Sequence, residues 1–186
     1  MSVWDKKRDV MRRYDVTAQI YDMRYAEEQT VKIEAALKHV KVKACMILDA
    51  GCGTGILFNY VADMAQMTLG LDVSKKTLLK AKEQSKNHAS VDLVCADVDN
   101  MPLKDRVFDR VFAMTLIQNT PVPAETLNEI RRVAADNALI VVTGLKKIFA
   151  RSVFRQLLKN AGLNNVAMED EGLKCYVAVC SKARRA

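Results

Sequence analysis

Three aspartates each follow a short apolar run, and a cluster of glycines comes directly after the first of them. Asp49 ends the first run, and Gly51, Gly53 and Gly55 follow at every second position before a helical pattern begins. A glycine in such a turn adopts positive φ easily and lets a ligand approach the backbone. Open α/β sheets bind nucleotide-like ligands where a strand ends and a helix begins. The pattern therefore predicts a binding site for a nucleotide-like ligand.

The glycine spacing separates this loop from two other ligand-binding loops. A dinucleotide-binding loop has the pattern G-x-G-x-x-G, whereas Gly51-Cys52-Gly53-Thr54-Gly55 brings the third glycine one residue early. No lysine follows the glycines, as it would in a phosphate-cradling P-loop. Neither histidine lies in a pattern that would activate Cys52, so we interpret Cys52 as a small loop residue and not as a nucleophile.

Asp72 is the second aspartate, and it lies 21 residues after Gly51. In nucleotide-binding folds an acid near this spacing accepts hydrogen bonds from ribose hydroxyls, and two hydroxyl donors suit one carboxylate. Ser74 is placed to cap the lysine-rich helix expected over residues 75–86. The alternative is that Asp72 is only a turn or capping residue.

The run Asp49-Ala50-Gly51-Cys52-Gly53-Thr54-Gly55 resembles the signature of class I S-adenosylmethionine (SAM)-dependent methyltransferases, and the likeness extends from about residue 14 to residue 182. The resemblance is to the type 11 group, and the segment from Tyr14 to Asp22 makes it similar to methyltransferases of ubiquinone and menaquinone biosynthesis. The resemblance implies SAM as cofactor and S-adenosylhomocysteine as product. It also implies that Asp97 accepts from the adenine amino group, beside the Val98 N–H, with Asp99 as the rival for that role. The expected cofactor-binding residues are Tyr21, Asp49, Gly51, Gly53, Gly55, Asp72, Val73, Asp97, Val98 and Met114.

The segment before the first strand carries aromatic residues that suggest a cover for the site. The run from Tyr14 to Asp22 is similar to a Tyr-Asp…Ala…Tyr-Asp segment that forms a lid over the cofactor in the relatives. We therefore expect residues 1–40 to form an N-terminal helical lid, with Tyr21 closing the pocket and excluding water. The alternative is a helix that packs its aromatic residues on the domain.

Strand-like and helix-like segments alternate along the chain, which predicts an α/β fold. The resemblance adds a seven-stranded, mostly parallel sheet of order 3-2-1-4-5-7-6, with strand 7 antiparallel and helices on both faces. A length of 186 residues fits one domain, which we expect over residues 1–186 with a Rossmann-like core over 41–186. The expected strands are 46–48, 67–71, 91–95, 108–114, 138–143, 165–170 and 174–181, and the main helices are 27–40, 75–86 and 147–161.

The loop after the fourth expected strand is the candidate for the acceptor side of the site. Gln118 and Asn119 lie where many relatives carry a His-His pair, and Asn119 begins an imperfect copy of a motif of amino-group methyltransferases. We expect Gln118 to bind substrate and Asn119 to position it, with an ordinary loop or helix-cap role as the alternative. His39 and His88 are predicted on the side of the sheet away from the site. Methyl transfer would then rest on proximity and orientation, without a general base.

The formal net charge of +7 and the pI of about 9.2 suggest an acidic partner, with RNA first. Lys147, Arg151, Arg155 and Lys159 recur every four residues, and a stripe that includes Arg151 and Arg155 is suited to the phosphates of tRNA or rRNA. The alternative for the stripe is a solvated helix face. Two other functions stay open: a small-molecule methyltransferase, and a methyltransferase-fold binding subunit that needs a partner for activity.

No apolar run approaches the roughly 20 residues of a membrane span, and no signal-peptide pattern begins the chain. We therefore expect a cytoplasmic protein with no membrane partner. The five cysteines form no C-x-x-C pair, so we expect neither disulfides nor a metal site. Residues 91–95 form an edge strand in the family order, and an edge strand accepts a strand from a partner. Some RNA and protein methyltransferases that resemble this chain pair in this way with a small zinc-binding activator protein.

Overall fold

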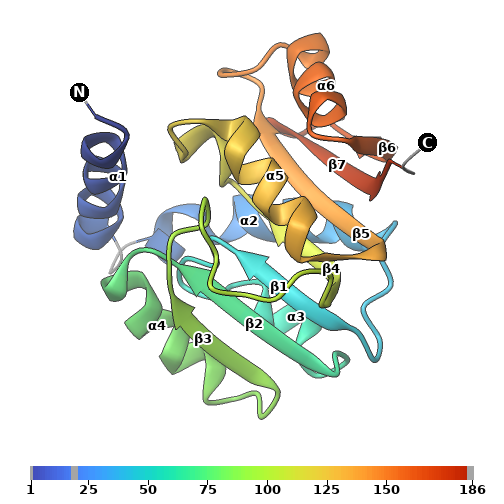
Figure 1. Cartoon of the computed structure of the whole chain (residues 1–186). Helices are drawn as coiled ribbons and strands as arrows, with labels where there is room; N and C mark the ends of the chain where they lie inside the picture. The colour runs from blue at the N-terminus through green and yellow to red at the C-terminus, as the bar shows by residue number, and fades with distance from the viewer. Residues whose placement is uncertain (1, 18–20, 184–186) are drawn as a thin grey trace.

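Seven strands form one sheet in the order β3-β2-β1-β4-β5-β7-β6 (Figure 1). In this computed structural model, residues 2–17 and 21–183 are described, except for the side chains of residues 17 and 21–24. β7 runs antiparallel to β5 and β6, and the other pairs are parallel, so the expected topology is confirmed. The strands are β1 (Met46–Ala50), β2 (Met67–Asp72), β3 (Val91–Cys95), β4 (Phe108–Ala113), β5 (Ala134–Leu145), β6 (Leu163–Glu169) and β7 (Cys175–Lys182).

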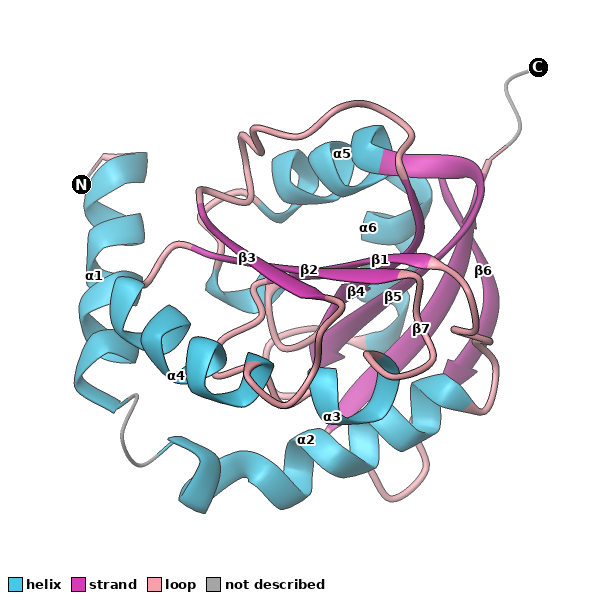
Figure 2. Cartoon of the chain, turned by 90° about the horizontal axis from the view of Figure 1, so that it is seen from below, coloured by secondary structure: helices cyan, strands magenta, loops and turns pink. Residues whose placement is uncertain are grey.

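Helices cover both faces of the sheet, as expected (Figure 2). α5 and α6 lie on one face, whereas α2, α3 and α4 lie on the other, and α1 stands beside α4 at one end of the sheet. No helix within residues 2–17 and 21–183 is long and apolar enough to span a membrane. The helices are α1 (Val3–Thr17), α2 (Tyr21–Leu37), α3 (Phe58–Val61), α4 (Lys75–Ser85), the 3₁₀ turn η1 (Ile117–Asn119), α5 (Pro123–Val133) and α6 (Arg151–Asn160).

The residues of β1 alternate between two hydrophobic cores, one on each face of the sheet. Ile47 packs in the same core as Ile33 and Ala36 of α2, whereas Leu48 packs in the core that contains Leu127 of α5. Successive side chains of a strand point to opposite faces, so one strand serves both layers. α2 is therefore part of the packed core, and within residues 1–40 α1 is the helix that stands apart from it.

Several element boundaries follow local signals, and others do not. Ser74 accepts a hydrogen bond from Thr77 N at 3.2 Å and caps α4, as predicted. Gly162 has a φ of 69° just after α6, a conformation typical of a residue that ends a helix. α6 begins at Arg151 and not at residue 147, because residues 146–148 form a turn after β5. β5 starts directly at the end of α5, four residues earlier than expected.

Candidate functional site

The described residues surround a cavity at the carboxyl ends of β1, β2 and β3, which we call the first cavity. It encloses about 1070 Å³ of empty space when its open mouth is included. α1 supplies Lys7, Val10 and Tyr14 to its wall, so this helix covers the ends of the strands. Residues of α1 thus line the same cavity as the glycine loop and the residues that follow β2 and β3.

Eight of the ten residues expected to bind a cofactor line the first cavity. Gly55 does not line it, and the side chain of Tyr21 lies outside the described part of the chain. Asp97 and Asp99, the two rivals for the adenine contact, both line it. The eight lining residues are Asp49, Gly51, Gly53, Asp72, Val73, Asp97, Val98 and Met114.

Two glycines of the loop have different tasks. Gly53 has a φ of 54°, and a Cβ atom there would meet nothing within 4 Å. Gly55 has a φ of 86°, and its Cβ would lie 2.5 Å from the ring of Phe58. Gly53 therefore borders the open space of the cavity, whereas Gly55 lets the chain turn tightly against the Phe58 side chain.

Asp49 is a buried carboxyl at the end of β1, and its residue is 3% exposed. Burial and the nearby charge of Asp72 raise the pKa of Asp49 to about 8. No residue in the described part of the chain donates a hydrogen bond to this carboxylate. A buried acid without a donor favours a cationic partner, because a nearby positive charge stabilises its ionised form.

Asp72 joins the glycine loop to the start of α4. Its carboxylate accepts hydrogen bonds from Gly53 N at 2.9 Å, Ser74 N at 2.8 Å and Thr77 Oγ1 at 3.3 Å. Burial raises the pKa of Asp72 even though these donors act in the opposite direction. The carboxylate is thus held in a fixed orientation at the cavity wall, and its remaining lone pairs are suited to hydroxyl donors.

Lys7 of α1 bridges Asp97 and Asp99. Its Nζ lies 2.6 Å from Asp97 Oδ2 and 2.7 Å from Asp99 Oδ2. Burial alone would lower the pKa of Lys7, but the two carboxylates outweigh it and the pKa is raised. Asp99 also accepts a hydrogen bond from Thr126 Oγ1 at 2.5 Å, which ties it to α5. Sequence reasoning missed Lys7, because no local pattern relates it to residues 90 positions away.

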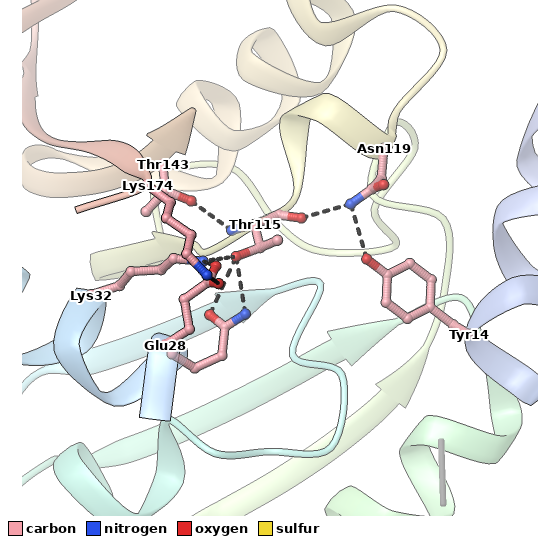
Figure 3. A network of polar contacts seen from close by, with 8 residues as sticks. Tyr14, Glu28, Lys32, Thr115, Asn119, Thr143 and Lys174 are labelled. Atoms are coloured by element: carbon pink, nitrogen blue, oxygen red, sulfur yellow. Dashed lines mark hydrogen bonds and ion pairs between the residues drawn. The ribbon is translucent and has the colours of Figure 1, made fainter. Parts of the chain in front are cut away.

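Asn119 holds α1 against the loop that follows β4 (Figure 3). Its Nδ2 donates to Tyr14 Oη at 3.0 Å and to the Thr115 carbonyl at 2.8 Å, and its Oδ1 accepts from Arg13 at 2.9 Å. A further contact of α1 joins Asp15 to Ser74 Oγ at 2.6 Å. Burial raises the pKa of the Tyr14 hydroxyl above its ordinary value. Asn119 is therefore fixed in the wall of the first cavity.

Thr115 has a φ of 57°, which is rare for a β-branched residue. Its backbone N–H donates to Thr143 Oγ1 at 2.6 Å. Its hydroxyl meets the Gln29 amide at 3.2 Å and accepts from Lys32 Nζ at 3.1 Å (Figure 3). The Lys32 side chain is 1% exposed and also pairs with Glu28 at 2.7 Å. These hydrogen bonds hold a strained backbone turn at the site. No sequence motif predicted this turn.

A second cavity opens beside the first, between α1 and the turn that follows β5. Both cavities are lined by Val10, Asn119, Thr120 and Pro121, so these residues form a shared wall. Gln118 lines the second cavity. Both cavities thus meet at the 3₁₀ turn η1.

The remaining candidates lie away from both cavities. Arg151 pairs with Asp170 at 3.5 Å, and Arg155 is exposed on α6; neither lines a cavity. His39 pairs with Glu169 at 2.7 Å, and His88 pairs with Asp63 at the same distance. No group of three His, Cys, Asp or Glu residues suited to a metal ion occurs among residues 2–17 and 21–183.

Comparison with known proteins identifies relatives of the chain. Residues 48–142 match the family model described as "Methyltransferase domain". A malonyl-[acyl-carrier protein] O-methyltransferase of Marinomonas sp. is 31% identical over 150 residues, which cover 79% of this chain and 55% of the relative. A ubiquinone biosynthesis O-methyltransferase of Bradyrhizobium diazoefficiens is 28% identical over 102 residues, covering 54% of this chain and 40% of the relative. The chain spans about half the length of the curated relatives it matches.

Solved structures share the fold. A SAM-dependent methyltransferase of Aquifex aeolicus superposes with a TM-score of 0.78 at 16% identity, covering 89% of this chain and 97% of that protein. A Haloferax volcanii structure, a complex between the Trm112 methyltransferase activator and a protein described as a methyltransferase, gives a TM-score of 0.81 at 16% identity. That match covers 92% of this chain and 98% of the other. At these identities the likeness concerns the fold.

Proposed function

The chain belongs to the methyltransferase domain family, and from that premise we propose that it transfers a methyl group from SAM to a small-molecule acceptor. The observation that carries the proposal is the first cavity, where the glycine loop, Asp49 and Asp72 meet under α1. The names of the two O-methyltransferase relatives support an oxygen atom as the methyl acceptor.

The residues of the first cavity fit the chemical groups of SAM. Asp49, a buried carboxyl without a donor among the described residues, suits the ammonium group of the amino-acid end. Asp72 is oriented by Gly53 and the start of α4 and suits the ribose hydroxyls. Asp97 lines the same cavity, is paired with Lys7 and suits the adenine amino group. When bound, SAM supplies a methyl group on a positively charged sulfur, which is already a strong electrophile.

The task of this chain's own residues is to bind, orient and exclude water. α1 covers the first cavity through Lys7 and Tyr14, which keeps bulk water from the reacting groups. Asn119 is fixed by three hydrogen bonds at the wall between the cavities, so it is placed to orient an acceptor. Holding the two reactants in line is the main source of acceleration for such a transfer.

The proposal is tested with methyl-labelled SAM, the purified protein and an extract of its source cells. After reaction the extract is separated into small molecules, RNA and protein. We expect the label in the small-molecule fraction. Label in RNA or protein would contradict the small-molecule acceptor, and SAM binding without any transfer would favour a binding subunit or a missing partner.

RNA is the second candidate acceptor, and the basic stripe supports it. Lys147, the first residue of the stripe, lines the second cavity, and Arg151 and Arg155 continue along α6. If RNA is the acceptor, reversing the charge of Arg151 and Arg155 flattens the salt dependence of RNA binding, because fewer counterions are released. An unchanged slope would assign the stripe to a solvated face.

A partner protein on β3 is a further part of this proposal. β3 lies at the edge of the sheet, and β2 is its only hydrogen-bonded neighbour among the described strands. An open edge accepts a strand from another chain, and one structure of this fold is a complex with a methyltransferase activator. The partner is tested by assaying the purified protein with and without such an activator. We expect methyltransferase activity to rise when the activator is added. Equal activity in both assays would contradict a partner on β3.

A further inference from the structure

The second cavity carries charge of one sign. Lys6 and Arg13 of α1 and Lys147 after β5 line it. Among the described residues of its lining there is no Asp, Glu, His, Cys or Tyr. Lys6 and Lys147 make no ion pair with any described residue, so their charges are not neutralised locally.

Gln118 adds an unpartnered amide to this cavity. Its Nε2 and Oε1 are both buried, and neither has a hydrogen-bond partner among the residues that the structure describes. A buried polar group without a partner costs roughly 1–3 kcal/mol. Such an amide is suited to a ligand that accepts or donates a hydrogen bond, and Gln118 lines the cavity where that ligand would lie.

Apolar residues complete the wall of the second cavity. Val10, Pro121, Leu145 and Ile148 line it beside the cations. Val10 and Pro121 also line the first cavity, and Asn119 stands in the same shared wall. A ligand with an anionic head and an apolar body would therefore match both kinds of lining and would lie next to the first cavity.

We propose that the second cavity binds the methyl acceptor and that this acceptor is a carboxylic acid with an apolar body, methylated on its own carboxylate. This inference rests on the proposed function. The carboxylate oxygen forms one new O–C bond with the methyl carbon as the C–S bond breaks and its electron pair stays on sulfur. The products are a methyl ester and a neutral thioether, so no proton moves.

The lining of the second cavity disfavours the other common nucleophiles. An alcohol needs a base to remove its proton, and lysine, arginine and glutamine side chains do not provide one at neutral pH. A free amine is mostly protonated at neutral pH, and three nearby cations repel a further positive charge. A carboxylic acid has a pKa near 4 and arrives already ionised. It is attracted by the same cations that repel the amine.

Binding of a simple probe tests the cavity without any turnover. Saturation-transfer NMR is recorded with hexanoate and with its neutral counterpart hexanamide, in the presence of S-adenosylhomocysteine. We expect hexanoate to bind and hexanamide to bind at least about tenfold more weakly, because the cations recognise the charge. The double variant Lys6→Glu/Lys147→Glu loses hexanoate binding. The matched control Lys43→Glu/Lys104→Glu, which changes net charge equally at exposed residues outside both cavities, keeps it.

The chemistry of the product tests the acceptor atom. Wild-type protein, methyl-labelled SAM and the small-molecule extract are incubated, and the product is treated with alkali, which releases a carboxyl methyl ester as volatile methanol. We expect the label to become volatile. The variant Gln118→Leu raises KM for the acceptor while leaving SAM affinity unchanged.

Three outcomes would overturn the inference. Alkali-stable label in the small-molecule fraction would contradict the carboxylate and leave the methyltransferase function standing. Equal binding of hexanoate and hexanamide, or equal loss in the Lys43/Lys104 control, would contradict the cationic cavity. No transfer into any fraction would contradict the proposed function itself.

Discussion

The first and second cavities share a wall at Asn119 but have opposite charge. Four aspartates line the first cavity with a single described cation, Lys7, among them. Three cations and no described acid line the second. The residues also differ in burial: Asp49 is 3% exposed, whereas Lys6 and Lys147 are exposed.

This difference matches the two partners of a methyl transfer. A cofactor with positive charge on sulfur and nitrogen is favoured by acids, and an anionic acceptor is favoured by cations. Asp49 is buried. Asp72 is held by the N–H groups of Gly53 and Ser74, and Asp97 is held by Lys7, so these acids are positioned before a ligand arrives. Lys6 and Lys147 are exposed, so they attract an anionic acceptor by charge, and the shared wall at Asn119 limits where that acceptor can lie.

Substitution of Asp72 is expected to have the largest effect on ligand binding in the first cavity. Asp72→Ala removes the acid suited to the ribose hydroxyls and its bonds to Gly53 and Ser74, and we expect SAM affinity to fall about 100-fold. Calorimetry measures the affinity, and thermal unfolding shows that the domain stays folded. The control is Asp92→Ala, on the exposed side of β3, which leaves affinity unchanged. Unchanged affinity in Asp72→Ala would place the ribose contact elsewhere.

Asp49→Asn is expected to change protein stability and SAM affinity in opposite directions. The folded-state pKa of Asp49, about 8, lies above its ordinary value of 3.8, so the folded protein holds an extra proton between these values. The protonated Asp49 therefore does not lower the free energy of unfolding below pH 4. Between pH 4 and pH 8 the free energy of unfolding falls as the pH rises, by up to roughly 1.4 kcal/mol per pH unit. We expect Asp49→Asn to flatten this slope, to stabilise the ligand-free protein at pH 7 and to weaken SAM binding about tenfold. A variant that binds SAM normally would show that Asp49 meets no cation.

Thr115→Val tests the strained turn in the shared wall. Valine keeps the branched shape but loses the hydroxyl that meets Lys32 and Gln29, so we expect the free energy of unfolding to fall by about 1–3 kcal/mol. Thr30→Val, which loses one hydrogen bond to Tyr60 outside both cavities, is the control. Denaturant titration compares them, and we expect kcat to fall for Thr115→Val alone because Asn119 bonds to the Thr115 carbonyl. If Thr115→Val and Thr30→Val changed kcat equally, the hydrogen bonds of Thr115 would have a structural role alone.

Lys7→Gln has the smallest expected effect on binding. Loss of the bridge to Asp97 and Asp99 loosens α1 and at the same time frees Asp97, so the two consequences for SAM affinity oppose each other. We expect a net change within about fivefold. Trp4, the single tryptophan of the chain, lies beside Lys7 and reports the change through its fluorescence. Emission identical to wild type, with unchanged proteolysis of α1, would mean that Lys7 does not hold the helix.

The parts of the site predicted from sequence are those encoded locally. The glycine loop and Asp72 have fixed spacing after short apolar runs, and a strand end places them without knowledge of the rest of the fold. The bridge from Lys7 to Asp97 and Asp99 could not be found in this way, and neither could the contact of Lys32 with Thr115, because these partners lie 83 to 92 residues apart along the chain. The φ of Thr115 also has no local signal, since threonine rarely adopts it.

The N-terminal helices and the basic stripe show a second reason why part of the site could not be predicted from the sequence. Periodicity groups Arg151 and Arg155 on α6, but Lys147 lies in the turn before this helix. Periodicity also does not say what these residues meet: Arg151 pairs with Asp170, whereas Lys147 lines the second cavity. The lid prediction gave Tyr21 more weight than Tyr14, whereas the described wall contains Tyr14. Which aromatic side chain reaches a cavity depends on how a helix docks, and docking is set by contacts distant in sequence.

Calorimetric titration with SAM at pH 7, in two buffers of different ionisation enthalpy, tests the account most directly. We predict that SAM binds and that NAD does not. We also predict that SAM binding releases close to one proton, because an ammonium group beside Asp49 lowers a pKa that stands at about 8 in the free protein. Tighter binding of NAD, or SAM binding without proton release, would contradict the assignment of the first cavity.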